Sequence, residues 1–225
     1  MTGTMITFAA NSRINNGYLA LPPSGSGPGL IVLQEWWGLV GHIKDVADQF
    51  AAAGFVALAP DMYHGEQTSN PDQAGKLLMA LNIAEAGVDL RGAADYLLAH
   101  PAVSPRKIGA MGFCMGGQLA LYAAQEMPEL VSACVDFYGI HPKVEITPSR
   151  ITVPVLGHFG KTDASVPLAA VHALVDGVNA AGGSFVAHEY DAGHAFCNPA
   201  RPGFDAATAA VAFARTVDFL KEQLR

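Results

Sequence analysis

The chain has 225 residues, of which 51% are hydrophobic, and its formal net charge at pH 7 is −7. This length suits one domain whose core is large enough to fold without disulfides or a metal. The negative charge and the lack of any lysine or arginine cluster argue against nucleic-acid partners, and no apolar stretch approaches the ~18 residues of a membrane span.

The N-terminal segment and the cysteines both indicate a cytoplasmic protein. Residues 1–13 lack the basic region and the long apolar run of a signal peptide. The three cysteines, Cys114, Cys134 and Cys197, form neither a paired framework nor a C-x-x-C metal spacing. We expect a reducing location in which a free thiol persists, and a monomer or small homo-oligomer that needs no cofactor.

The first half of the chain alternates predicted strands with predicted helices. Residues 29–34 (GLIVLQ) form a continuous apolar run, the pattern of a strand buried on both faces. Apolar residues at i, i+3, i+4 and i+7 predict a helix over residues 43–50. A second buried strand is predicted at residues 55–60, and a helical region follows within residues 71–99, with a break near Asn82.

The second half repeats this alternation. Strands are predicted at residues 107–113, 130–139, 153–160 and 184–190, and helices at residues 115–127 and 166–181 and along the stripe Phe213, Val217, Leu220 and Leu224. Such alternation predicts one α/β domain, residues 1–225, with a mostly parallel central sheet and helices on both faces. Active residues of such sheets gather beyond the carboxyl ends of the strands.

Cys114 lies in the middle of residues 112–116 (GFCMG), between a predicted strand and a predicted helix. A glycine-flanked nucleophile at such a junction sits on a strained turn at the top of the sheet. The helix N-terminus favours a thiolate, and the N–H of Met115 is the natural first oxyanion-hole donor. Most free cysteines are small buried hydrophobes, and we keep that interpretation for Cys134 and Cys197.

A nucleophilic cysteine needs a base and an orienting acid, which follow the nucleophile in the order acid, histidine in α/β-hydrolases. Asp163 and His194 each lie in a loop just past a predicted strand, where a parallel sheet delivers them to the edge that carries the nucleophile. His158 and His188 fall inside strand patterns and are predicted to be core or surface histidines. Asp191 is the rival acid, but its place three residues before His194 favours a turn-capping role.

Residues 16–220 resemble the dienelactone hydrolases, a family of α/β-hydrolases with a cysteine nucleophile. The resemblance is carried by the segments LQEWWG, APDMY, EAGVDLRGAADYL, GFCMGG, FYG, GKTDASVP and AGHAF. It implies the α/β-hydrolase fold and a triad of Cys114, Asp163 and His194, the same three residues that the elbow and the chain order indicate.

The resemblance also implies a role for Glu35, in the segment QEWWG. The family has a glutamate here that holds the resting thiol and accepts its proton when substrate binds, which protects the thiol from oxidation. The alternative for Glu35 is a loop carboxylate at a helix start. The N–H of Trp36 would be the second oxyanion donor. The implied reaction is lactone ring opening through an acyl-enzyme.

The sequence departs from the family in its arginines. The best-known members hold the substrate carboxylate with two arginines, one after the PDLY-type segment and one after the GHSF-type segment. Here His64 stands near the first position, and Arg201 is the nearest arginine after the second; both are candidate substrate-binding residues. An aromatic-lined substrate pocket is suggested by Trp36, Trp37 and Tyr138, although aromatic residues are more often core residues.

These observations predict an enzyme that hydrolyses a small lactone or enol ester of the dienelactone type. A general carboxylesterase or thioesterase on another acyl substrate is the first alternative. A hydrolase fold that has lost catalysis and serves as a binding module is the second, and the complete set Cys114, Asp163 and His194 argues against it. A metal hydrolase is disfavoured because the histidines lack a paired ligand spacing such as H-x-x-x-H.

Overall fold

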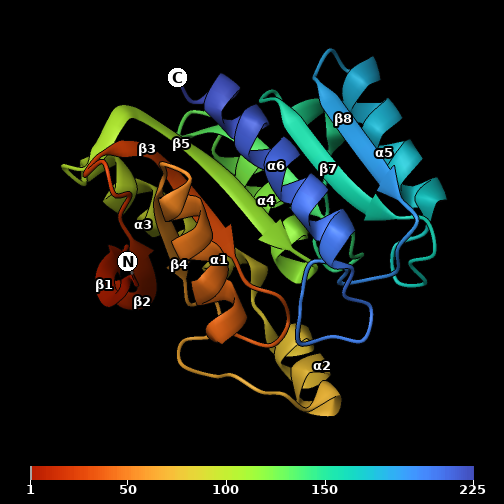
Figure 1. Ribbon diagram of the computed structural model, residues 1–225, viewed down its shortest axis with the longest axis horizontal. Coiled ribbons are helices and arrows are strands. Elements are labelled where there is room, and N and C mark those ends of the chain that lie inside the picture. The colour runs from red at the N-terminus through yellow and green to blue at the C-terminus, as the bar shows by residue number, and fades with distance from the viewer. Residues whose placement is uncertain (1) are drawn as a thin grey trace.

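The computed structural model describes residues 2–225, and its strands form one eight-stranded sheet (Figure 1). The strands are β1 (Thr4–Ala10), β2 (Arg13–Ala20), β3 (Gly27–Leu33), β4 (Val56–Pro60), β5 (Val103–Phe113), β6 (Val131–Phe137), β7 (Val155–Gly160) and β8 (Phe185–Tyr190). Their order is β1-β2-β4-β3-β5-β6-β7-β8. β2 pairs antiparallel with β1 and with β4, whereas every other neighbouring pair is parallel. The prediction of a mostly parallel sheet is confirmed.

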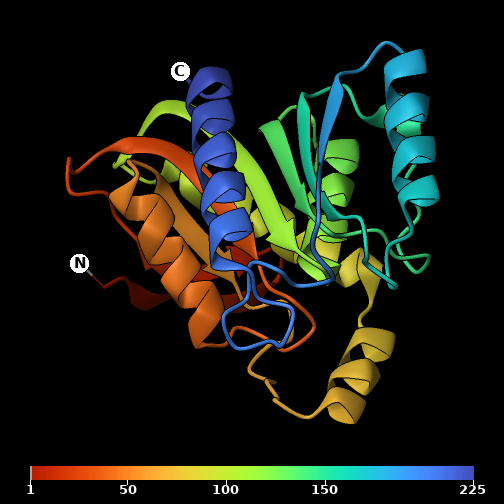
Figure 2. The ribbon, with the colours of Figure 1, turned by 45° about the vertical axis from the view of Figure 1, so that its right-hand side comes forward.

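Helices cover both faces of this sheet (Figures 1 and 2). The helices are α1 (Gly41–Ala52), α2 (Pro71–Ala80), α3 (Ile83–Ala99), α4 (Met115–Glu126), α5 (Leu168–Ala180) and α6 (Ala206–Gln223), with a short 3-10 helix at Pro148–Arg150. Buried residues of α1 and α6 belong to one apolar core, and those of α3, α4 and α5 belong to the other. The sheet therefore lies between two helical layers, as the sequence predicted.

The apolar run of β3 shows why both faces are covered. Successive side chains of a strand point to opposite faces. Leu30 and Val32 are buried in the core under α1 and α6, whereas Ile31 and Leu33 are buried in the core under α3 and α4. A continuous apolar run is thus satisfied only in the middle of a sandwich of helices, which is the place that β3 occupies.

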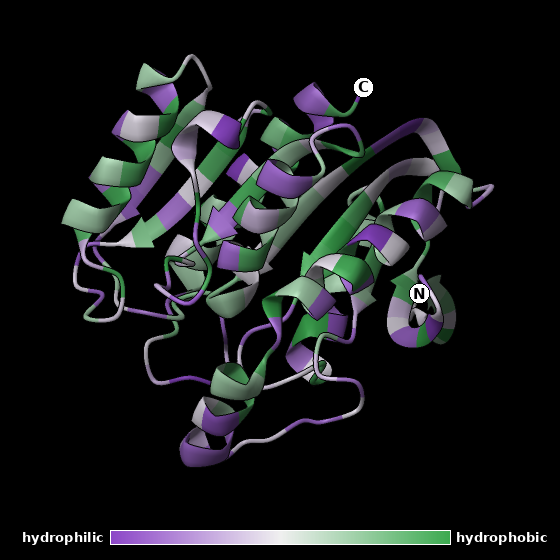
Figure 3. Cartoon of the chain, turned by 180° about the vertical axis from the view of Figure 1, so that it is seen from behind, coloured by the Kyte–Doolittle hydropathy of each residue, from purple (hydrophilic) through white to green (hydrophobic). Residues whose placement is uncertain are grey.

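The predicted break in the helical region is confirmed at Asn82. Its side chain accepts hydrogen bonds from the N–H groups of Ala84 and Glu85, at 3.0 and 3.3 Å, and so begins α3. The preceding helix α2 projects away from the rest of the molecule (Figures 1 and 2). Ala74 is its one buried residue, and its far end is hydrophilic (Figure 3).

The N-terminal hairpin of β1 and β2 is not apparent from the sequence, because neither strand carries a continuous apolar run. Each strand contains both buried and exposed residues; β1 is the edge strand of the sheet, and β2 lies between β1 and β4. Among residues 2–225 no helix combines the length and the apolar character that a membrane crossing requires.

Candidate active site

Cys114 occupies a strained turn between β5 and α4. Its backbone has φ 54° and ψ −119°, a conformation that a residue with a side chain rarely adopts, and it immediately precedes the helix. The turn packs closely against the end of β3. A Cβ added at Gly116 would lie only 2.5 Å from the backbone oxygens of Leu33 and Gln34, so only glycine fits there. The strand, turn and helix that an elbow requires are therefore present, and α4 begins directly after the thiol.

The loops after β7 and β8 bring Asp163 and His194 together. Nδ1 of His194 lies 2.7 Å from Oδ2 of Asp163, whose other oxygen accepts the N–H groups of Ser165 and Val166 at 2.7 and 3.0 Å. Burial opposes protonation of His194, but the hydrogen bonds to Asp163 and Cys114 outweigh it and raise the pKa of His194 to about 10. The carboxylate thus orients the ring and stabilises its charged form.

The other acid and histidine considered for the triad, Asp191 and His158, do not contact the pair Asp163–His194. Asp191 forms an ion pair with Lys161 at 3.0 Å and is 90% exposed, so Asp163 is the acid that contacts His194. His158 is fully buried, with its two ring nitrogens 2.9 Å from the hydroxyls of Tyr190 and Thr216. Burial lowers the pKa of His158 to about 3, which keeps this core histidine neutral.

Glu35 is buried in the loop after β3 and lines the same cavity as Cys114. It is 2% exposed; Oε2 accepts a short hydrogen bond from the side-chain amide of Asn198, and Oε1 has no partner. Burial raises the pKa of Glu35, while the Asn198 bond and the charges of His194 and Arg201 oppose that rise. A carboxylate with one free oxygen in an apolar place is able to take up a proton.

One cavity of about 580 Å³ collects most of the residues singled out by the sequence. Eight of the ten line it: Glu35, Trp36, Trp37, Cys114, Met115, Tyr138, His194 and Arg201. Asp163 stands behind His194, in contact with it. The other walls come from Leu78 at the end of α2 and from the segments 140–142, 165–166 and 202–203. The cavity is therefore large and mostly apolar, with its polar groups gathered around the thiol.

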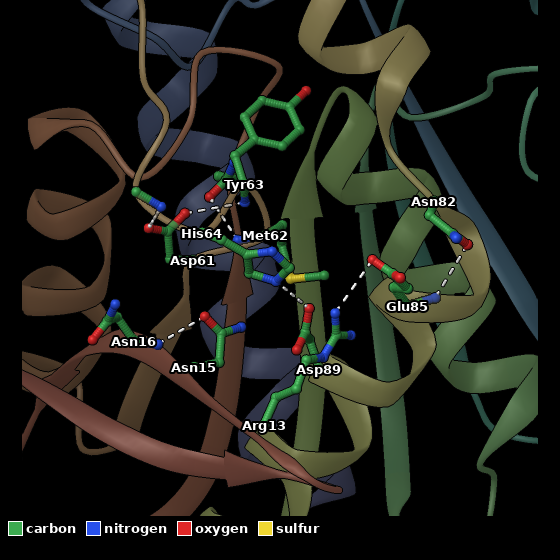
Figure 4. Close-up of polar contacts among 12 residues, drawn as sticks. Arg13, Asn15, Asn16, Asp61, Met62, Tyr63, His64, Asn82, Glu85 and Asp89 are labelled. Carbon is green, nitrogen blue, oxygen red and sulfur yellow. Dashed lines mark hydrogen bonds and ion pairs between the residues drawn. The ribbon is translucent and has the colours of Figure 1, made fainter.

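His64 is the one predicted site residue that the fold turns away from this cavity. Its Nε2 lies 2.7 Å from Oδ2 of the buried Asp89 on α3, among polar residues that include Arg13 and Glu85 (Figure 4). The carboxyl group of Asp89 needs a partner inside the protein, and His64 provides it. His64 consequently stands outside the group of residues around Cys114, contrary to the expectation of a substrate contact.

Arg201 and Tyr138 are two further polar residues of the cavity. The guanidinium carbon of Arg201 lies 3.6 Å from the ring centroid of Trp37, a stacked cation–π arrangement. Tyr138 is fully buried, its ring centroid is 5.1 Å from that of His194, and its hydroxyl has no partner. Nε of Arg201 is likewise buried and unpartnered.

Three residues of the site escaped sequence reasoning. Asn198 holds Glu35, Tyr63 donates its hydroxyl to the sulfur of Met115 at 3.1 Å, and His141 lines the cavity. The sequence around each of these three residues does not indicate a place in the site, because the site joins segments that are distant in the sequence. Asn198 and Glu35 are 163 residues apart.

A parallel sheet that carries a cysteine elbow, with an acid–histidine pair in the loops of later strands, defines an α/β-hydrolase. Residues 15–224 match the sequence profile of the Dienelactone hydrolase family, and the chain belongs to this family. It is a carboxylic ester hydrolase.

Individual relatives agree with this family assignment. Protein usf of Aquifex pyrophilus is 37% identical over 230 residues, which are 99% of each chain. Carboxymethylenebutenolidase 1 of Cupriavidus pinatubonensis is 32% identical over 232 residues, 97% of this chain and 95% of the relative. The crystal structure of a dienelactone hydrolase-like promiscuous phosphotriesterase from metagenomic libraries has a TM-score of 0.85 at 25% identity, and all of both chains is covered.

Proposed function

We propose that this enzyme opens a lactone or enol ester of the dienelactone type by covalent catalysis at Cys114. The observation that supports this best is that the elbow thiol, His194 and Glu35 line one cavity, with Asp163 bound to the histidine. The name of the carboxymethylenebutenolidase relative indicates the same substrate class. Small-molecule esters or lactones are accordingly the ligands we infer.

Acylation begins with a proton transfer from the Cys114 thiol to Glu35. The raised pKa of Glu35, which burial causes, suits a group that takes this proton only when a substrate arrives. The sulfur then attacks the ester carbonyl carbon, and the carbonyl oxygen becomes an oxyanion. The backbone N–H groups of Trp36 and Met115 are the donors we assign to it.

The ring C–O bond breaks when the oxyanion collapses, and the leaving oxygen takes a proton from the His194 imidazolium. The ring is protonated while it faces the Cys114 thiolate, because the hydrogen bonds and charges of Asp163 and of Cys114 raise the pKa of His194. The substrate is now a thioester of Cys114. Neutral His194 next removes a proton from water, and the resulting hydroxide attacks the acyl carbon and releases the acid and the Cys114 thiolate, while Asp163 orients the ring. The proton held by Glu35 then returns to the sulfur, which restores the thiol, and His194 is again protonated for the next cycle.

A second candidate function is a carboxylesterase or thioesterase with a bulkier substrate. The cavity of about 580 Å³ has room for more than a five-membered lactone with one short side chain, and Arg201 is the one arginine that lines it. A substrate with one carboxylate against Arg201 and an apolar portion along Leu78 and Ile140 fits these walls.

Turnover of cis- and trans-dienelactone and of simple aryl esters by the wild type and by Cys114→Ala tests both candidates. We expect Cys114→Ala to lose roughly 10³-fold or more in kcat/KM on every substrate. Cys134→Ala, which removes a buried thiol of β6 away from the cavity, is the control and should retain activity. Full activity of Cys114→Ala would refute the nucleophile, and aryl-ester activity without dienelactone activity would favour the carboxylesterase.

Alkylation by iodoacetamide tests the resting state of the thiol. If Glu35 holds a neutral thiol until substrate binds, Cys114 should react slowly at neutral pH in the free enzyme. Peptide mapping would separate its rate from that of the partly exposed Cys197. Rapid alkylation of Cys114 without substrate would contradict the role of Glu35.

A further inference from the structure

A second cavity lies beside the active site, between α1, α6 and the sheet. Its volume is about 400 Å³, within the range of small-molecule pockets, roughly 300–1,000 Å³. Five of the chain's eleven phenylalanines line it: Phe50, Phe113, Phe137, Phe204 and Phe213. An aromatic ring is the occupant that such walls favour, because ring faces and ring edges pack well on one another.

The two cavities lie back to back and share no lining residue. Phe113 lines the second cavity and the next residue, Cys114, lines the first; Phe137 and Tyr138 divide in the same way. Since neighbouring residues at the ends of β5 and β6 line different cavities, these strand ends form the partition. The second cavity is thus a separate space and not an extension of the substrate pocket.

His42, Asp45 and Gln49 are the polar residues of α1 that line the second cavity. The His42 ring lies 6.0 Å from that of Phe113, and its buried Nε2 has no hydrogen-bond partner. Burial lowers the pKa of His42, against the opposing effect of Asp45, so the ring is neutral at neutral pH. A nitrogen of a neutral imidazole either donates or accepts, and a hydroxyl group satisfies it in both cases.

We propose that this cavity is a binding site for a neutral aromatic molecule with a hydroxyl group, a phenol being the simplest example. The ring would lie among the phenylalanines, and the hydroxyl would pair with Nε2 of His42 once the imidazole turns toward the cavity, since this nitrogen is buried and unsatisfied in the free protein. The exposed carboxylate of Asp45 at the same cavity disfavours an anion.

Calorimetric titration with phenol locates the site when it is repeated on three matched tryptophan variants. Ala209→Trp fills the second cavity and should abolish saturable binding, whereas Ala207→Trp, at an exposed position of the same helix, should not. Ile140→Trp narrows the active-site cavity and should leave the affinity unchanged. No saturable binding to the wild type would overturn the proposal, as would binding that Ile140→Trp abolishes and Ala209→Trp retains.

His42→Leu tests the hydroxyl contact by comparison with toluene, which has the ring alone. The ratio of phenol affinity to toluene affinity should fall by about three- to tenfold in this variant, the effect of one hydrogen bond. An unchanged ratio would refute the contact with His42. Benzoate, the anionic counterpart, is expected not to bind, and an affinity equal to that of phenol would refute selection for a neutral molecule.

Discussion

The carboxyl group of Glu35 lies in a buried environment that favours its neutral form. Burial raises its pKa, so the folded chain binds this proton more tightly than the unfolded chain. The contribution of Glu35 to the free energy of unfolding therefore falls as the pH rises from the ordinary carboxyl range through the raised pKa. The charged form of Glu35 therefore does not stabilise the fold. Its burial is consistent with the role of proton acceptor that we propose.

Glu35→Gln is expected to be more stable than the wild type at pH 8, by about 1–3 kcal/mol, because it removes a buried charge with one unpartnered oxygen. At pH 5 the gain should be smaller, since more of the wild-type carboxyl is then protonated. Denaturant unfolding at both pH values measures the difference. Glu222→Gln at an exposed site is the control, and an equal gain at both pH values would contradict the argument.

The element that matters most to the site is α4, which presses its first turn against the end of β3. Gly116→Ala would place a Cβ 2.5 Å from the backbone oxygens of Leu33 and Gln34, so the helix and the strand would have to separate. We expect a loss of about 1–3 kcal/mol in stability together with a loss of turnover. Gly75→Ala, in open space on α2, should instead stabilise by about 0.5–1 kcal/mol. Thermal unfolding and initial rates check both variants.

Helix α2 depends on one side chain from another segment. Lys143 donates to the carbonyl oxygens of Leu78 and Met79 at the end of the helix, a favourable place for a cation. Since little of α2 is buried, Lys143→Met should speed amide exchange in α2 and leave the global unfolding midpoint nearly unchanged. A parallel rise of exchange throughout α3 would show instead that the whole layer had loosened.

At the scale of the whole molecule, the pair His194–Asp163 links stability to pH. The pKa of His194 is raised to about 10 in the folded state, against about 6.5 for an ordinary histidine. Its stabilising contribution is complete below about pH 6.5 and declines as the pH rises towards 10. Asp163→Asn removes the partner, so the stability difference between wild type and variant should shrink from pH 6.5 to 9.5 in urea titrations. A difference that grows with pH would reverse the assignment.

The elements that local chemistry specifies could be predicted from the sequence. The run at β3, the cap at Asn82 and the elbow around Cys114 each depend on residues within a few positions of one another. The chain order of Asp163 and His194 was also informative, because the parallel strands that precede these residues end at the same edge of the sheet. Strands β1 and β2 carry no continuous apolar run, so a search for such runs does not find them.

The sequence by itself therefore determined the fold class, the elbow and the acid–histidine pair, because these follow from hydrophobic periodicity and from turn chemistry. Only the tertiary structure decided that His64 pairs with Asp89, that Asn198 holds Glu35, that Arg201 stacks on Trp37 and that a second aromatic cavity exists. Each of these joins residues far apart in the chain. Such contacts depend on how layers pack, which no short window of sequence contains.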